Sequence, residues 1–138
     1  MKLPWIGALI SLTMLALTGG EGLQCYEPPL PIQLASFTGA RVDSSGYSWV
    51  QLRWTTISET NNYGFWIQRN GITLDESFVA GNGTTLEVHQ YAYKDINPPK
   101  YQVNEYRLLQ MDLDGTAHLS DRIIISPSKV ESNSAQSK

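Results

Sequence analysis

Short runs of alternating apolar and polar residues follow one another along most of the chain. In Ser48–Trp54, the side chains of Val50, Leu52 and Trp54 fall on one face of an extended strand, and Trp49 falls on the other. Successive side chains of a strand point to opposite faces, so this period of two predicts a strand with one buried face. Trp54 ends the inward run and is expected to be the central core residue.

Similar runs recur along the chain, separated by turn residues. Asp114-Gly115 stands between two apolar runs and predicts a hairpin, because both residues tolerate a positive φ. About seven such strands predict an all-β, antiparallel sandwich or barrel, and a seven-stranded sandwich with one polar face per sheet explains the alternation. The expected strands are Ile32–Val42, Ser48–Trp54, Gly64–Asn70, Ile72–Ala80, Glu87–Lys94, Asn104–Asp112 and Ala117–Ser126.

The N-terminal segment has a different pattern. After Lys2 the chain carries no charge until Glu21, and its apolar residues concentrate in Trp5–Leu17. A basic residue, a short apolar stretch and then small residues are typical of a secretory signal peptide, which we assign to residues 1–24. A signal anchor retained in the membrane is the alternative, although a spanning helix needs about 20 predominantly apolar residues. The mature protein is therefore expected to be secreted or at the cell surface.

Cys25 follows this segment and is the only cysteine in the chain. Gln24 departs from the pattern that precedes a lipid-modified cysteine, which favours a free thiol in the proline-rich arm of residues 25–31. Lipidation of the thiol and a cross-link between two copies are the alternatives.

Composition and charge narrow the class of protein. The 138 residues leave room for one domain, here residues 32–126, and the polar tail 127–138 is expected to be disordered. A hydrophobic content of 41% excludes a disordered chain. The net charge is −3, whereas a nucleic-acid-binding protein typically carries a basic surface, so the charge argues against nucleic-acid binding. One cysteine excludes an internal disulfide, and two histidines argue against structural zinc.

The most specific pattern is VQLRWTTISETNNYGFWIQR at Val50–Arg69. It resembles the B strand, B–C turn and C strand of fibronectin type III-like modules in bacterial secreted and cell-surface proteins, and further matches extend from Leu34 to Ile125. The matching signature residues are Leu52, Trp54, Thr56, Ser58, Glu59, Thr60, Asn61, Asn62, Gly64, Phe65, Ile67 and Arg69.

The resemblance implies an immunoglobulin-like β-sandwich that serves as an extracellular spacer or interaction domain. Such modules often stand just before a sorting domain of a type IX-like secretion system. Both a free-standing module and a fragment of a larger surface protein fit this chain. The expected role is therefore that of a non-catalytic structural, adhesion or spacer module.

The signature also has a direct physical interpretation. Side chains of Ser58–Asn62 can bond to nearby backbone N–H groups and fix a tight turn, with Glu59 as a capping acid. Gly64 then allows a backbone angle that other residues resist. Tyr106 starts a late strand, where the hydroxyl of a tyrosine often bonds to an upstream loop carbonyl.

Residues with catalytic potential are few. His89 and His118 lie in expected strands without a base–nucleophile arrangement, and Glu59 has no second carboxylate at a useful spacing. Gly81–Thr84 is interpreted as a turn rather than a phosphate-binding loop. We therefore expect no catalytic, cofactor or metal site and no enzymatic activity.

Two tryptophans raise an alternative function. Trp49 and Trp66 lie opposite the inward runs, and exposed aromatic rings can stack on sugars, so a carbohydrate-binding module is the second hypothesis. Their strands belong to different sheets in a fibronectin-type sandwich, which argues against one shared platform and favours packing under neighbouring loops. The expected protein is a monomer whose partner is an unknown protein or polysaccharide. It would bind no nucleic acid, and no membrane after signal cleavage.

Export predicts a defined N-terminus. Protein recovered from outside the cell should begin between Gly20 and Cys25, because Thr18-Gly19-Gly20 supplies the small residues at which signal peptides are cut. Mass spectrometry of the intact protein measures this directly. Secreted protein that still carries Met1 would contradict the prediction.

Overall fold

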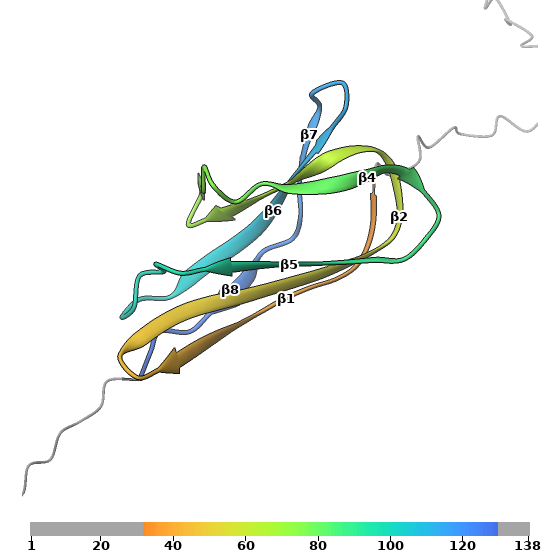
Figure 1. The fold of residues 1–138 in the computed structure, drawn as a ribbon. Helices are drawn as coiled ribbons and strands as arrows, with labels where there is room; N and C mark the ends of the chain where they lie inside the picture. Colours follow the sequence, from red (N-terminus) through yellow and green to blue (C-terminus); the bar gives the residue numbers. More distant parts are fainter. Residues whose placement is uncertain (1–31, 130–138) are drawn as a thin grey trace, which may run out of the picture.

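The computed structural model describes residues 32–129, and every regular element in this range is a β-strand (Figure 1). The strands pair only in antiparallel fashion, which confirms an all-β fold. No helix in the described range could cross a membrane. The strands are β1 (Ile32–Ser44), β2 (Tyr47–Arg69), β3 (Ile72–Thr73), β4 (Val79–Thr85), β5 (His89–Asp95), β6 (Asn104–Asp112), β7 (Ala117–Leu119) and β8 (Ile123–Ile125).

Some expected regions lie outside this range. The signal peptide (1–24), the proline-rich arm (25–31) and the tail from residue 130 onward are not among the described residues. Of the expected tail, Pro127–Lys129 is described. Ser128 is 9% exposed, and its backbone N–H donates to the carbonyl of Lys100 at 2.8 Å. The packed domain therefore extends past the expected boundary at Ser126.

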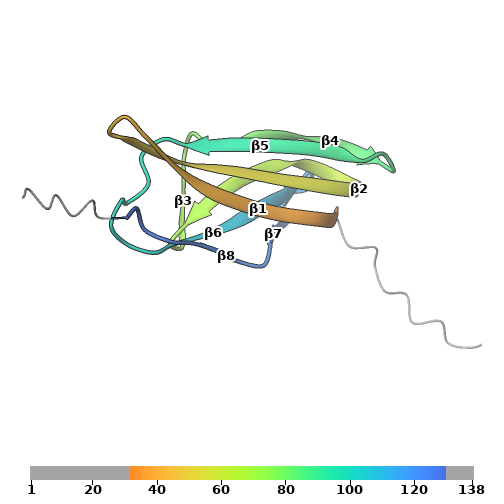
Figure 2. The same ribbon diagram turned by 90° about the horizontal axis from the view of Figure 1, so that it is seen from below.

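Strand β2 organises the whole sheet. Its first part pairs with β1 on one side and β5 on the other, over Val50–Thr56. Its second part, Asn62–Arg69, pairs instead with β4 and β6, and β6 in turn pairs with β7 and β8. Because the neighbours change within one strand, the antiparallel sheet curls, and β5 lies on the opposite side of the molecule from β8 (Figure 2).

The tight turn predicted at Ser58–Asn62 is wrong, because this segment stays extended inside β2. The register with β4 shifts on both sides of Asn62, and Asn61 has a φ of +52°. Bulges bend a strand and increase its twist, and asparagine tolerates the left-handed conformation. The signature therefore bends a 23-residue strand rather than ending it.

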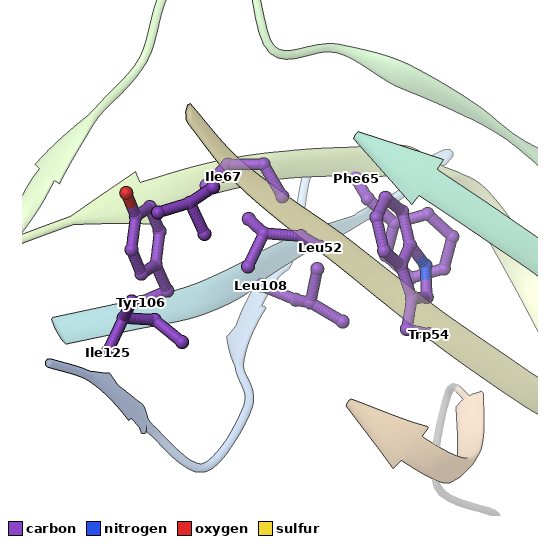
Figure 3. Close-up of a cluster of buried hydrophobic side chains, with 8 residues drawn as sticks. Leu52, Trp54, Phe65, Ile67, Tyr106, Leu108 and Ile125 are labelled. Carbon is purple, nitrogen blue, oxygen red and sulfur yellow. The ribbon is translucent and has the colours of Figure 1, made fainter. Parts of the chain in front are cut away.

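The core lies between the two parts of β2 (Figure 3). Val50, Leu52 and Trp54 are at most 1% exposed, which confirms the predicted inward face of the first part. Trp54 meets the ring of Phe65 edge-on, with ring centroids 5.4 Å apart, and stacks on Tyr91 at the same distance. The other buried hydrophobic members are Ile67, Tyr106, Leu108 and Ile125.

The predictions for the C-terminal hairpin are partly confirmed. The bounds Asn104–Asp112 agree with β6, and the Asp114-Gly115 turn is present, with Gly115 at a φ of +88°. The single strand predicted over Ala117–Ser126 is divided into β7 and β8. Between them, the Ser120 N–H donates to the Leu108 carbonyl at 3.0 Å, but the Leu108 N–H donates to the Ser120 hydroxyl at 2.9 Å. A side chain therefore takes one of the two bonds of the strand ladder there.

The middle of the chain differs more from the prediction. Only Ile72–Thr73 and the last two residues of the strand expected at Ile72–Ala80 are extended. Strand β4 instead includes Gly81–Thr84, the segment predicted as a turn. A Cβ on Gly81 would lie 2.6 Å from the Asn62 Cγ atom, so this glycine permits close strand approach.

The core predicts a difference between two tryptophans. Trp54→Ala removes a fully buried ring and should lower the free energy of unfolding by about 3–5 kcal/mol. The matched control, Trp49→Ala, removes a half-buried ring under the Lys94 ammonium and should cost about 1 kcal/mol. Urea unfolding of the mature protein measures both values. Equal losses would contradict the assigned inward and outward faces.

Candidate functional site

The signature acid Glu59 lies at the centre of a buried hydrogen-bond network. It is 1% exposed, and its carboxylate accepts bonds from the Thr56 hydroxyl, the Asn62 amide and the Asn82 backbone N–H, each at 2.8 Å. The Tyr91 hydroxyl donates a fourth bond. Two donors therefore serve each carboxylate oxygen, which offsets the cost of burying the charge. The predicted backbone capping accounts for one donor, and side chains supply the others.

The protonation states of this network follow from its contacts. Burial raises the pKa of Glu59, but the bonds from Tyr91, Asn82, Asn62 and Thr56 outweigh burial and hold this pKa below its ordinary value of 4.5. Burial and the bond to Glu59 raise the pKa of Tyr91 to about 12. At neutral pH, Glu59 is thus a carboxylate with its lone pairs occupied, and it offers no free oxygen to a substrate. Its geometry joins the bend in β2 to β4 and β5.

A second buried carboxylate lies at the other end of the core. Asp95 is 4% exposed and accepts bonds from Arg69 Nη1 to both oxygens, at 2.9 and 2.6 Å. The Tyr106 hydroxyl donates to the same carboxylate at 2.7 Å. The predicted bond from Tyr106 to a loop carbonyl is therefore wrong, because the end of β5 brings a stronger, charged acceptor within reach. Burial and this contact raise the pKa of Tyr106.

The remaining signature residues hold the bend in place. The Asn61 N–H donates to the Thr84 hydroxyl at 3.0 Å, and the Asn61 carbonyl accepts the Leu113 N–H at 2.7 Å. Asn62, 1% exposed, accepts a bond from the Gln110 amide at 3.3 Å. These contacts tie the bend to β4 and to the β6–β7 hairpin.

Gly64 is required for space rather than for its backbone angle. It does not have a positive φ, contrary to the expectation. A Cβ at this position would lie 2.6 Å from the Val79 carbonyl oxygen and 2.8 Å from the Phe78 Cζ atom. The ring of Phe78 therefore occupies the position that a side chain on residue 64 would take.

Trp66 belongs to an aromatic triad with Tyr63 and Phe78. Its ring centroid lies 4.5 Å from that of Phe78 and 6.1 Å from that of Tyr63, and the Tyr63 and Phe78 centroids are 5.2 Å apart. Trp49 is separate, with the Lys94 ammonium 4.3 Å above its ring. The sequence analysis identified Trp66 but missed Tyr63 and Phe78, because nothing local showed that the segment before β4 packs on Gly64.

Two grooves lie away from both carboxylates. One, of about 1040 Å³, is lined by residues that include Asp43, Tyr47 and Lys100. The other, of about 670 Å³, lies between the start of β1 and the β6–β8 region and includes His118. Neither is lined by Glu59, Asp95 or the triad. Residues 32–129 contain no group of three or more His, Cys, Asp or Glu side chains placed to hold a metal ion.

The fold and these contacts define an antiparallel all-β domain with a buried carboxylate at each end of its core. Comparison with known proteins does not extend this description. No protein-family model matches the chain, and no curated protein matches it at a significant level.

The Glu59 network predicts a pH-dependent stability difference. Glu59→Gln replaces charge-assisted bonds by neutral ones and should cost about 1–3 kcal/mol at pH 7. Because the pKa of Glu59 is lowered by folding, its contribution is complete above the unfolded value of 4.5 and is lost as the pH falls through the folded pKa. The cost of the substitution should therefore shrink towards pH 3.

Urea unfolding between pH 7 and pH 3 tests this expectation. Other acids with lowered pKa values, Asp43 and Asp114, are present in both proteins and cancel in the difference. The exposed Glu87, changed to Gln, is the matched control and should alter stability by less than about 0.5 kcal/mol. A cost for Glu59→Gln that is the same at both pH values would contradict the prediction.

Proposed function

We propose that the chain is an exported, monomeric, fibronectin type III-like module that acts as a non-catalytic spacer or adhesion domain at the bacterial cell surface or outside the cell. The strand neighbours support an immunoglobulin-like sandwich. One layer would contain β1, the first part of β2 and β5, and the other would contain β4, the second part of β2, β6, and β7 with β8. The expected signal peptide supports export.

The observation that carries the spacer role is the position of the two ends of the domain. Ile32 pairs with Glu59 at one end of β1, whereas the Ser128 hydroxyl donates to Asp43 at 2.9 Å near the other end. The first and last described residues accordingly lie at opposite ends of the molecule (Figures 1 and 2). A domain with this arrangement adds its own length between the segments on either side of it.

The buried contacts make such a spacer stiff. At one end of the core, hydrogen bonds to the Glu59 carboxylate hold the bend of β2. At the other end, the Asp95 carboxylate of β5 binds the side chains of Arg69 and Tyr106. Near the exit, Arg41 donates at 3.0 Å to the carbonyls of Ser126 and Pro99. Charge-assisted bonds of this kind are stronger than neutral ones and resist opening of the ends.

The distance between the ends tests the proposal. Spin labels on Gln33→Cys and Lys129→Cys, with Cys25 changed to Ser, should give one narrow distance of roughly 30–35 Å, since a strand rises about 3.3 Å per residue. Both labelled positions are exposed. Pulsed electron resonance measures the distribution.

Labels at Ser44→Cys and Lys129→Cys, both at the exit end, provide the control and should lie much closer together. A short or broad distribution between positions 33 and 129 would overturn the spacer role.

A further inference from the structure

The aromatic triad lies on the outer face of β2, opposite the core. Phe65 and Ile67 of the same strand are fully buried, whereas Tyr63 is 49% exposed and Phe78 is 40% exposed. Trp66 is half-buried between this surface and the sheet. The ring planes are inclined to one another by only 30–44°. The three rings pack on one another as one aromatic cluster, in which Tyr63 and Phe78 are open to solvent.

The backbone fixes the position of this surface. Gly64 stands between Tyr63 and Phe65 in β2, and the Phe78 ring packs directly on it. A side chain at this position would displace Phe78 and separate the rings. The ring arrangement therefore depends on the absence of a side chain at residue 64.

The sheet positions next to Trp66 and Gly64 are uncharged. In the strand ladder, Trp66 is opposite Leu109, which is opposite Leu119. Gly64 is likewise opposite Met111, which is opposite Ala117. Residues that pair across strands share a face, so these four side chains continue the same uncharged surface. The next pair on this face is Gln68 with Arg107, and the Arg107 Nε lies 3.4 Å from the Glu105 carboxylate, which balances its charge. A ligand that matches this surface in charge is therefore neutral.

We propose that the triad is a binding platform for a neutral polysaccharide, whose sugar rings would stack on Tyr63, Trp66 and Phe78. Aromatic rings of tyrosine and tryptophan combine an apolar face with a polar group, which suits a ring that has C–H faces and hydroxyl edges. Gln68, two residues after Trp66 on the same face, supplies an amide for those hydroxyls. This inference rests on the proposed adhesion function and names its ligand.

The size of the surface favours a polysaccharide over a protein partner. A stable protein interface uses about 20–30 residues on each side. Here, three rings and four sheet neighbours form the uncharged surface. A polymer of small repeating units gains affinity from few contacts per unit by binding several modules at once.

Binding of defined polysaccharides tests the proposal. Full-length mature protein is run in affinity gels that contain xylan, mannan or a mixed-linkage β-glucan, and its pull-down on cellulose is measured. Polygalacturonate serves as the charged probe. At least one neutral polymer should bind saturably, and Tyr63→Ala and Trp66→Ala should each weaken this binding about tenfold or more. Trp49→Ala, the matched control away from the triad, should leave the affinity unchanged.

Loss of binding must be distinguished from loss of folding. Tyr63 is 49% exposed and lies outside the buried core cluster, so Tyr63→Ala separates loss of binding from loss of folding. Urea unfolding of each variant confirms the folded state. The proposal is overturned if no neutral polymer binds, if only polygalacturonate binds, or if both triad variants bind as well as the unchanged protein. Self-association lost in Trp66→Ala, without polysaccharide binding, would also overturn it and would assign the face to a protein contact. None of these outcomes alters the end-to-end distance that tests the spacer role.

Discussion

The bonds to the buried Glu59 carboxylate are the constraint on which the rest of the fold depends. Strand β2 provides neighbours for both parts of the sheet, so its bend decides which strands can meet. At that bend a charge is removed from water, and this is stable only when donors from β2, β4 and β5 converge on it. The position of the bend is therefore fixed by the requirement to satisfy one carboxylate.

The same principle operates at the other end of the core. Asp95 is buried with Arg69 and the Tyr106 hydroxyl, so β5 carries a polar anchor at each end, Tyr91 and Asp95. Between these anchors, apolar and aromatic side chains form the core cluster. The outer face of β2 is free of this packing and can present the triad without disturbing the interior. The proposed spacer role rests on the tied interior, and the proposed adhesion role rests on the separate outer surface.

Much of the local structure could be predicted from the sequence. Alternation identified the inward residues Val50, Leu52 and Trp54, and the Asp114-Gly115 pair identified the hairpin, because both signals depend on neighbours a few residues apart. Predictions failed where the role of a residue depends on contact with a strand that is distant in the sequence. The residues of Gly81–Thr84 are typical of a turn, but this segment lies in β4. The absence of a side chain on Gly81 leaves room for the Asn62 side chain.

The sequence alone thus determined that the protein is built of strands, which residues face inward, and which short segment is most specific. Only the tertiary structure decided that this segment bends one strand, that Tyr106 bonds to Asp95, and that Trp66 meets Phe78. The reason is physical. Strand period and turn residues act over a few positions, whereas a buried charge or a ring packed on Gly64 is satisfied by groups far away in the chain, whose positions exist only after the sheet has formed.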